Sequence, residues 1–266
     1  MEDLSLSKFT SLDQVKALET YVDALKAFDA IEELQELKRI ERALVHPLSS
    51  VLDVGCGFGL ETECLARLVD PGQPVVGIDE SAHFIAEAKR RAESARVHID
   101  YQTGRAEALP YADCSFSHVR AERLLIYLPD ARKALSEMKR VLLPGGTLAL
   151  IEPDFGTTTV NVEDRKLVRR VMAHEADNAV KQSWLPGKLA PMLAELGLRD
   201  VAVSTRVIIF PQSLGVTYFS SVAQSAAGDG AISKDECECW QAEIAELGHS
   251  GRLFGTVGYF LFIASA

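Results

Sequence analysis

Residues 51–59, with the sequence VLDVGCGFG, constrain the fold of this chain more than any other segment. A short apolar run that ends in alternate glycines is typical of a buried strand followed by a turn, where glycine lets the backbone approach a ligand. Further apolar runs follow, separated by stretches with helical periodicity. We therefore expect strands at residues 51–54, 74–78, 97–101, 116–120, 147–151, 201–210 and 258–263. Strands alternating with helices predict an α/β fold with a parallel sheet covered on both faces.

The composition excludes several classes of protein. With 266 residues, 47% of them hydrophobic and 25% charged, the chain resembles an ordinary globular protein rather than a disordered or fibrous one. Its net charge of −10 would repel a nucleic acid duplex, so we expect no nucleic acid partner.

The termini and cysteines bear on location and metal binding. The chain begins with acidic residues, unlike a signal peptide, and no apolar run approaches the ~20 residues that span a bilayer. We therefore expect a cytoplasmic protein with no membrane contact. The five cysteines are irregularly spaced and odd in number, which favours free thiols over disulfides or a metal site.

Two aspartates indicate which ligand the glycine turn would bind. The glycines follow the pattern G-x-G-x-G, whereas the dinucleotide fingerprint is G-x-G-x-x-G. Asp53, just before the turn, would repel a pyrophosphate and suits a ligand that carries an ammonium group. Asp79, at the end of the second strand, is placed to accept both hydroxyls of a ribose. A ligand with an ammonium group, a ribose and no phosphate is S-adenosylmethionine.

Several motifs then resemble one known family. Residues 51–59 and the following Gly77–Ser81 resemble the first two motifs of class I S-adenosylmethionine-dependent methyltransferases. Later motifs appear in the same order over roughly residues 48–154, at Gly104–Tyr111, Phe116–Arg120, Leu128–Asp130 and Arg140–Gly146. The resemblance is greatest to the small-molecule enzymes, including the ubiquinone/menaquinone-biosynthesis type.

The resemblance implies a fold and a domain organisation. It implies a Rossmann-like sheet of seven mostly parallel strands in the order 3-2-1-4-5-7-6, with an antiparallel strand seven and a helical lid. Residues 1–47 would form an N-terminal helical lid, because two amphipathic helices precede the sheet. Residues 48–266 would form the core, with lid insertions at about 155–185 and 211–250.

The resemblance also implies a set of cofactor-binding residues. They would lie in the glycine turn, at the end of the second strand, in the adenine loop and on the fourth strand: Asp53, Gly55, Cys56, Gly57, Asp79, Glu80, Arg105, Ala106, Glu107, Arg120 and Ala121. Arg105 departs from the family, which usually has an aspartate there, and arginine cannot accept a hydrogen bond from adenine. Backbone groups would then hold the adenine.

The expected activity is methyl transfer to a small organic acceptor by direct in-line displacement on O, N or C. Motifs of DNA methyltransferases are missing, since neither a D/N-P-P-Y/F segment after the fourth strand nor a Pro-Cys dipeptide occurs. No enzyme nucleophile is needed, so Cys56 is interpreted as a small residue beside the ligand. His174 and Glu175 are the candidates for a general base, although the same pattern fits a solvated helix face. Trp184, Tyr218 and Phe219 would line an apolar acceptor pocket or the core of a lid.

Two other interpretations stay open. One is an NAD(P)-dependent oxidoreductase, which Asp53 and the glycine spacing disfavour. The other is a protein of this fold that binds the cofactor without transferring methyl. The sequence does not indicate which acceptor is used or which oligomer forms.

Overall fold

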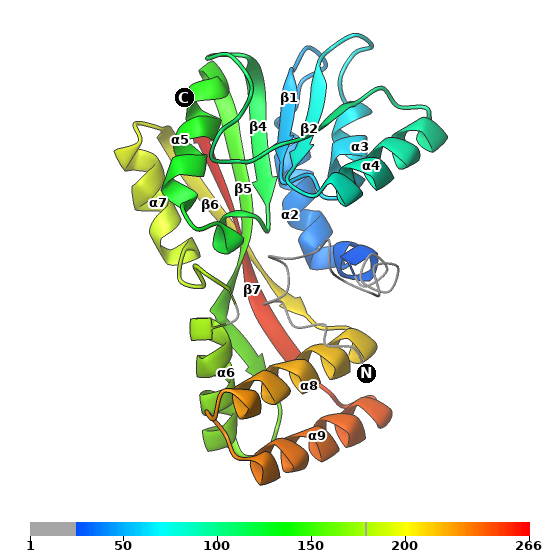
Figure 1. Cartoon of the computed structure of the whole chain (residues 1–266), viewed down its shortest axis with the longest axis vertical. Helices are drawn as coiled ribbons and strands as arrows, with labels where there is room; N and C mark the ends of the chain where they lie inside the picture. The colour runs from blue at the N-terminus through cyan, green and yellow to red at the C-terminus, as the bar shows by residue number, and fades with distance from the viewer. Residues whose placement is uncertain (1–24, 179) are drawn as a thin grey trace. The chain divides into compact units, whose positions relative to one another are not determined.

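The computed structural model describes residues 25–178 and 180–266 (Figure 1). Seven strands form one sheet in the order β3-β2-β1-β4-β5-β7-β6, which confirms the predicted order. The strands are β1 (Val51–Val54), β2 (Val75–Asp79), β3 (Asp100–Thr103), β4 (Phe116–Glu122), β5 (Leu142–Val160), β6 (Arg199–Ile209) and β7 (Gly255–Ser265).

The strand directions also agree with the prediction. β1 pairs in parallel with both β2 and β4, and β2–β3 and β4–β5 are parallel as well. β7 runs antiparallel to β5, because Gly145 and Ala266 are bonded at one end of the pair and Asn161 and Phe254 at the other. The carboxyl ends of β1, β2 and β4 therefore meet at one edge of the sheet, where ligands bind in open α/β folds.

Helices follow most of the strands, and their ends agree with simple capping rules. Ser81 accepts a hydrogen bond from the backbone NH of Phe84 at the start of α4 (Ala82–Ala95), and Ser233 and Glu236 form a capping box on α9 (Lys234–His249). The remaining elements are α2 (Glu32–Arg42), α3 (Leu60–Ala66), η2 (Leu125–Tyr127), α5 (Ala131–Val141), α6 (Arg165–Asn178), α7 (Pro186–Glu195) and α8 (Gln212–Gly228).

Several predicted strands have different bounds in the structure, β3 and β5 among them. β3 begins at Asp100, not at residue 97. β5 spans 19 residues, whereas the sequence predicted a helix through Leu143, a break at Pro144–Gly146 and a loop from residue 155. The break does not occur because Gly145 and Gly146 exchange backbone hydrogen bonds with Ala266. The threonines from Thr157 favour extended backbone, as β-branched residues do.

The chain divides into two compact units. The sheet unit comprises Glu36–Glu152, Leu185–Thr205 and Phe260–Ala266; the helical unit comprises the described residues up to Gln35, Pro153–Trp184 and Arg206–Tyr259. The expected lid insertions at 155–185 and 211–250 fall almost entirely in the helical unit. The expected N-terminal lid is divided, because residues 36–47 belong to the sheet unit. The predicted helix that begins at Leu12 lies mostly outside the described residues.

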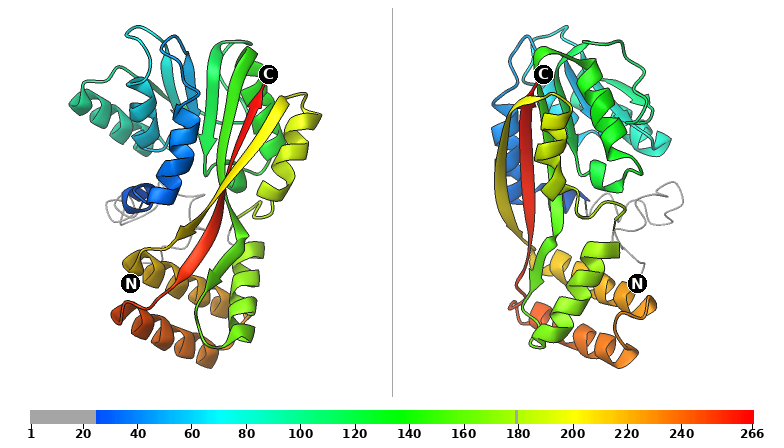
Figure 2. Two further views of the ribbon diagram at one scale, coloured as in Figure 1. Left: turned by 180° about the vertical axis from the view of Figure 1, so that it is seen from behind. Right: turned by 90° about the vertical axis from the view of Figure 1, so that its left-hand side faces the viewer.

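Each unit has its own core. In the sheet unit, Val51, Leu52, Val119 and Leu148 are fully buried. Here α5 and α7 lie side by side (Figure 2), where Arg132 pairs with Glu195 and Lys139 donates to the carbonyl of Leu196. In the helical unit the core is aromatic, and the Phe210 ring stacks on Tyr218 with centroids 4.7 Å apart. Within the part of the chain that the structure describes, no helix is both long and apolar enough to cross a membrane.

Candidate cofactor site

The glycine turn after β1 has the geometry of a ligand cradle. Gly57 and Gly59 have φ angles of +54° and +81°, in the region that glycine adopts without strain. A Cβ added at Gly57 would meet no atom within 4 Å, so the backbone there borders open space. A Cβ at Gly59 would come 2.2 Å from the Tyr101 hydroxyl, which packs under the turn. The turn is therefore closely packed at Gly59 and open at Gly57.

Asp79 joins this turn to the end of β2. One of its carboxylate oxygens accepts the backbone NH of Gly57 and the other that of Ser81, both at 2.9 Å. Each oxygen keeps a second lone pair, and the side chain is only partly buried. Burial raises the pKa of Asp79, while the two backbone hydrogen bonds favour its charged form. The residue is thus fixed in place and still able to accept the hydroxyls of a ribose.

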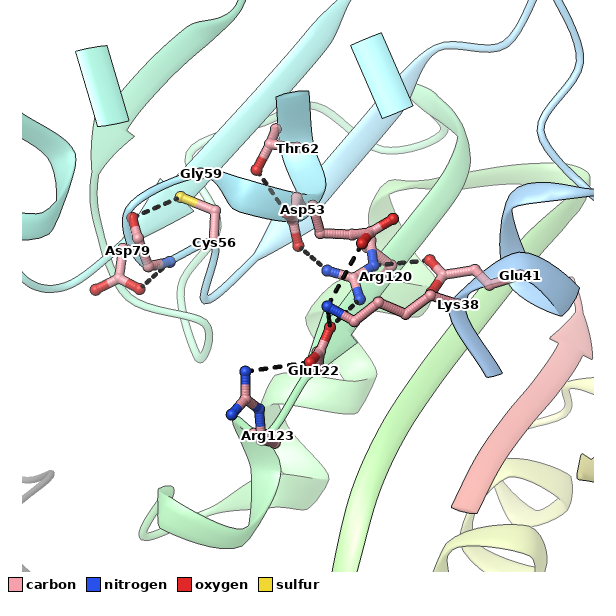
Figure 3. A network of polar contacts seen from close by, with 12 residues as sticks. Lys38, Glu41, Asp53, Cys56, Gly59, Thr62, Asp79, Arg120, Glu122 and Arg123 are labelled. Atoms are coloured by element: carbon pink, nitrogen blue, oxygen red, sulfur yellow. Dashed lines mark hydrogen bonds and ion pairs between the residues drawn. The ribbon is translucent and has the colours of Figure 1, made fainter. Parts of the chain in front are cut away.

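Asp53 lies under the turn and is bonded within the protein. One oxygen accepts from the Thr62 hydroxyl at 2.6 Å and the other from the Arg120 guanidinium at 2.8 Å. Arg120 faces Asp53 across the β1–β4 ladder, and both are almost completely buried. The Arg120 guanidinium also donates to Glu41 at 2.7 Å and to Glu122 at 2.8 Å (Figure 3). Arg120 therefore links three carboxylates from three elements.

Helix α2 adds further charges to this network. Lys38 lies 2.9 Å from Glu122 and 3.5 Å from Glu61, and Arg42 lies 2.6 Å from Glu61. With Arg123 beside Glu122, four cations face four carboxylates: Lys38, Arg42, Arg120 and Arg123 against Glu41, Asp53, Glu61 and Glu122. We call this set the charge network. His118 also contacts Glu41, at 3.4 Å.

Within the charge network, neighbouring charges favour the ionised forms of Arg120, Glu122 and Glu41, whereas burial raises the pKa of Asp53. Burial disfavours the charged guanidinium, yet Asp53, Glu41 and Glu122 raise the pKa of Arg120 well above its usual value. Burial alone would raise the pKa of Glu122, but Lys38, Arg123 and Arg120 lower it far below its usual value. In the same way Arg120 and His118 lower the pKa of Glu41 against the effect of burial.

Glu152 holds the turn after β4 against the glycine turn. One of its oxygens accepts the backbone NH groups of Leu124 and Leu125, at 3.0 and 2.7 Å. The Leu124 side chain packs against Gly55, where an added Cβ would lie 2.8 Å from it. Glu152 is fully buried, and burial raises its pKa to about 8. Its second oxygen has no hydrogen-bond partner among the described residues.

The other residues of the predicted cofactor set fall into three groups, and their contacts with the cofactor stay predictions. Gly55, Cys56 and Gly57 lie in the turn, and Ala121 is buried at the end of β4. Burial raises the pKa of the Cys56 thiol well above its usual value, which is unsuited to a nucleophile. Glu80 is exposed after Asp79. In the expected adenine loop, Arg105 is exposed and pairs with Glu107 at 3.3 Å, and Ala106 is buried.

The candidate bases lie in the helical unit. His174 and Glu175 are consecutive on α6 but have different partners. The His174 ring contacts Asp229 at 2.9 Å. Glu175 is buried and accepts a hydrogen bond from the Tyr218 hydroxyl at 3.0 Å, and burial raises its pKa to about 7. Phe219 is fully buried, whereas Trp184 is 55% exposed and donates to Asp177.

Comparison with known proteins agrees with this geometry. Residues 52–150 match the model of the methyltransferase domain family. A demethylmenaquinone methyltransferase of Shouchella clausii is 33% identical over 175 residues, which cover 59% of this chain and 73% of the relative. A 37.1 kDa protein in transposon TN4556 of Streptomyces fradiae is 29% identical over 253 residues, 93% of this chain and 71% of the relative.

A solved structure shows the same fold. Phosphoethanolamine N-methyltransferase 2 of Haemonchus contortus superposes with a TM-score of 0.62 and 17% identity, covering 98% of this chain and 60% of that one. The fold, the glycine turn and the sequence relatives together define a class: the chain belongs to the S-adenosylmethionine-dependent methyltransferases of class I. Its cofactor is S-adenosylmethionine.

Proposed function

We propose that this methyltransferase transfers a methyl group to a small organic acceptor by direct in-line displacement. The observation that carries the proposal is the open backbone at Gly57 beside the fixed carboxylate of Asp79. When bound, the cofactor supplies a methyl group activated by its sulfonium. The protein then has to bind, orient and exclude water, and needs no nucleophile of its own.

Each part of the site has a role in this proposal. The backbone of Gly55–Gly57 approaches the cofactor, Asp79 and Glu80 face its ribose, and the loop 105–107 faces its adenine. Asp53 contributes negative charge at the ammonium end. The guanidinium of Arg120 is surrounded by carboxylates of the protein, which supports a role in holding Asp53 and Glu122.

The acceptor is the least defined part of the proposal. The related demethylmenaquinone methyltransferase supports a small-molecule acceptor over a macromolecule, as does the net charge of −10. A hydroxyl acceptor would need a base, for which Glu175 stays a candidate from the sequence, and burial raises its pKa to about 7. Release of S-adenosylhomocysteine from a library of phenols, amines and activated carbon acids would identify the acceptor class.

Isothermal titration distinguishes the proposed cofactor from its alternative. We expect S-adenosylhomocysteine to bind and NAD not to bind. Binding of NAD alone would favour the oxidoreductase interpretation. Binding of S-adenosylhomocysteine with no turnover across the whole acceptor library would instead favour a protein that holds the cofactor without transferring methyl.

Replacing Asp79 tests the ribose contact directly. Asp79→Ala removes two charge-assisted hydrogen bonds, each worth about 1.5–3 kcal/mol, so the dissociation constant of S-adenosylhomocysteine should rise at least about ten-fold. Glu80→Ala, on the neighbouring exposed side chain, should have a smaller effect. An unchanged dissociation constant in Asp79→Ala would show that the ribose binds elsewhere.

A short truncation tests the lid hypothesis. Deleting residues 1–24 keeps Lys38, Glu41 and Arg42, which form ion pairs within the sheet unit. We expect S-adenosylhomocysteine to bind with unchanged affinity and methyl transfer to fall, because a lid excludes water and aligns the acceptor. Full activity in the truncated protein would show that these residues are not part of a lid.

A further inference from the structure

Glu122 occupies a particular place in the charge network. It is the last residue of β4, at the carboxyl edge of the sheet, and the turn that follows it packs on Gly55 through Leu124. Arg120 donates to Glu122 and Asp53 at the same time, so one guanidinium joins these two carboxylates at the ligand edge of the sheet. Glu122 and the glycine turn are thus linked by the contacts of Arg120 with Asp53 and of Leu124 with Gly55.

Burying the charge network costs free energy, because each charge loses its contact with water. Burying ion pairs removes water from every charge, and an apolar core of the same volume is often at least as stable. Here the side chains of Lys38, Arg120, Glu41 and Asp53 are no more than 2% exposed. Stability alone therefore does not explain why charges are retained at this edge.

One oxygen of Glu122 is not fully satisfied. Oε2 lies within 2.9 Å of both Lys38 and Arg120. Oε1 is buried, receives no hydrogen bond from the described residues, and lies 3.2 Å from the Arg123 guanidinium. Both oxygens of Asp53, in contrast, accept good hydrogen bonds. Glu122 therefore has one oxygen without a hydrogen-bond donor among the described residues, whereas Asp53 has none.

The ligands of the proposed reaction differ mainly in charge. S-adenosylmethionine carries a positive sulfonium, whereas S-adenosylhomocysteine carries a neutral thioether, and the remaining groups are the same. We propose that Glu122 is a specificity-determining residue whose charge favours the sulfonium form over the product, and that Lys38 sets the strength of this preference. This inference rests on the proposed function.

The cations around Glu122 explain why the preference would be moderate. Lys38, Arg120 and Arg123 all face it, and together they weaken its field. Removing the charge of Glu122 leaves those cations to repel a sulfonium. Removing the charge of Lys38 leaves Glu122 less neutralised and increases its attraction for a sulfonium. The two changes therefore have opposite signs, which a purely structural role would not produce.

The experiment measures the dissociation constants of both ligands by isothermal titration for Glu122→Gln, Lys38→Gln and the double variant. In Glu122→Gln the preference for S-adenosylmethionine over S-adenosylhomocysteine should fall about ten-fold, the size expected for one unit charge in a partly buried site. In Lys38→Gln it should rise, and in the double variant it should return toward the original value. Glu195→Gln, in the exposed pair with Arg132, is the matched control.

The outcomes separate the two proposals. If the unmodified protein binds neither ligand, the proposed function itself fails. If it binds both and Glu122→Gln weakens them equally, Glu122 is only structural and the inference is overturned. Should Glu122→Gln not fold, Lys38→Gln decides: a higher preference for S-adenosylmethionine supports the inference, and an unchanged or lower one overturns it.

Discussion

Arg120→Met is expected to lower the free energy of unfolding by about 3–5 kcal/mol, the usual cost of breaking a buried ion pair by removing one partner. The guanidinium donates to Glu41, Asp53 and Glu122, and each of these side chains is no more than 7% exposed. Methionine fills much of the same volume, so the lower free energy of unfolding would come from three buried carboxylates that lose their cationic partner and not from a cavity. Urea unfolding followed by circular dichroism measures the change.

Arg132→Met provides the matched control. Arg132 pairs with Glu195 at 2.8 Å, but both side chains are more than half exposed. Exposed pairs contribute at most about 1 kcal/mol, so this variant should unfold almost like the original protein. Equal changes in the free energy of unfolding for Arg120→Met and Arg132→Met would contradict the view that Arg120 stabilises the sheet beside the glycine turn. Arg120→Lys should be intermediate, because one ammonium group cannot reach three carboxylates in the planar geometry of a guanidinium.

Most of the fold could be predicted from local patterns. The short apolar runs at 51–54 and 116–120 ended at glycine or polar residues, and helices of ordinary length separated them, so parallel strands were expected. The strand order itself was expected from the resemblance to the methyltransferase family. β5 was harder, since Pro144, Gly145 and Gly146 are strong signals for a break. They remain in the strand because of hydrogen bonds to Ala266, which is distant in sequence. The residues around Pro144 do not indicate that a distant segment pairs with them.

The cofactor site was predictable only where a motif lies in one continuous segment. Asp79 and the glycine turn were located because strand ends in a parallel sheet meet at one edge. The charge network was missed: Lys38, Glu41 and Arg42 follow helical spacing on α2 and look like a solvated face. Their partners Glu61 and Glu122 are far along the chain. Arg120 was included as a cofactor contact, and its protein partners emerged only with the fold.

Glu152→Gln is expected to change how stability depends on pH. The folded-state pKa of Glu152 is raised to about 8 from its ordinary value of 4.5, chiefly by burial. Between these two values the unfolded chain has lost this proton and the folded protein still holds it. The folded state then binds more protons, so the free energy of unfolding falls as pH rises through this window and levels off above about 8. Gln cannot ionise and still offers an oxygen to Leu124 and Leu125.

The difference in the free energy of unfolding between the original protein and Glu152→Gln reports the titration of Glu152 alone. Relative to Glu152→Gln, the original protein should lose about 2–4 kcal/mol of stability between pH 5 and pH 9. Glu175→Gln is the comparison, because burial raises the pKa of Glu175 only to about 7. Its difference from the original protein should therefore level off about one pH unit earlier. Urea unfolding at several pH values gives both curves. A constant difference between Glu152→Gln and the original protein would mean that Glu152 is ionised throughout. Its carboxylate would then hold the turn after β4 as a charged acceptor, and burial would not have raised its pKa.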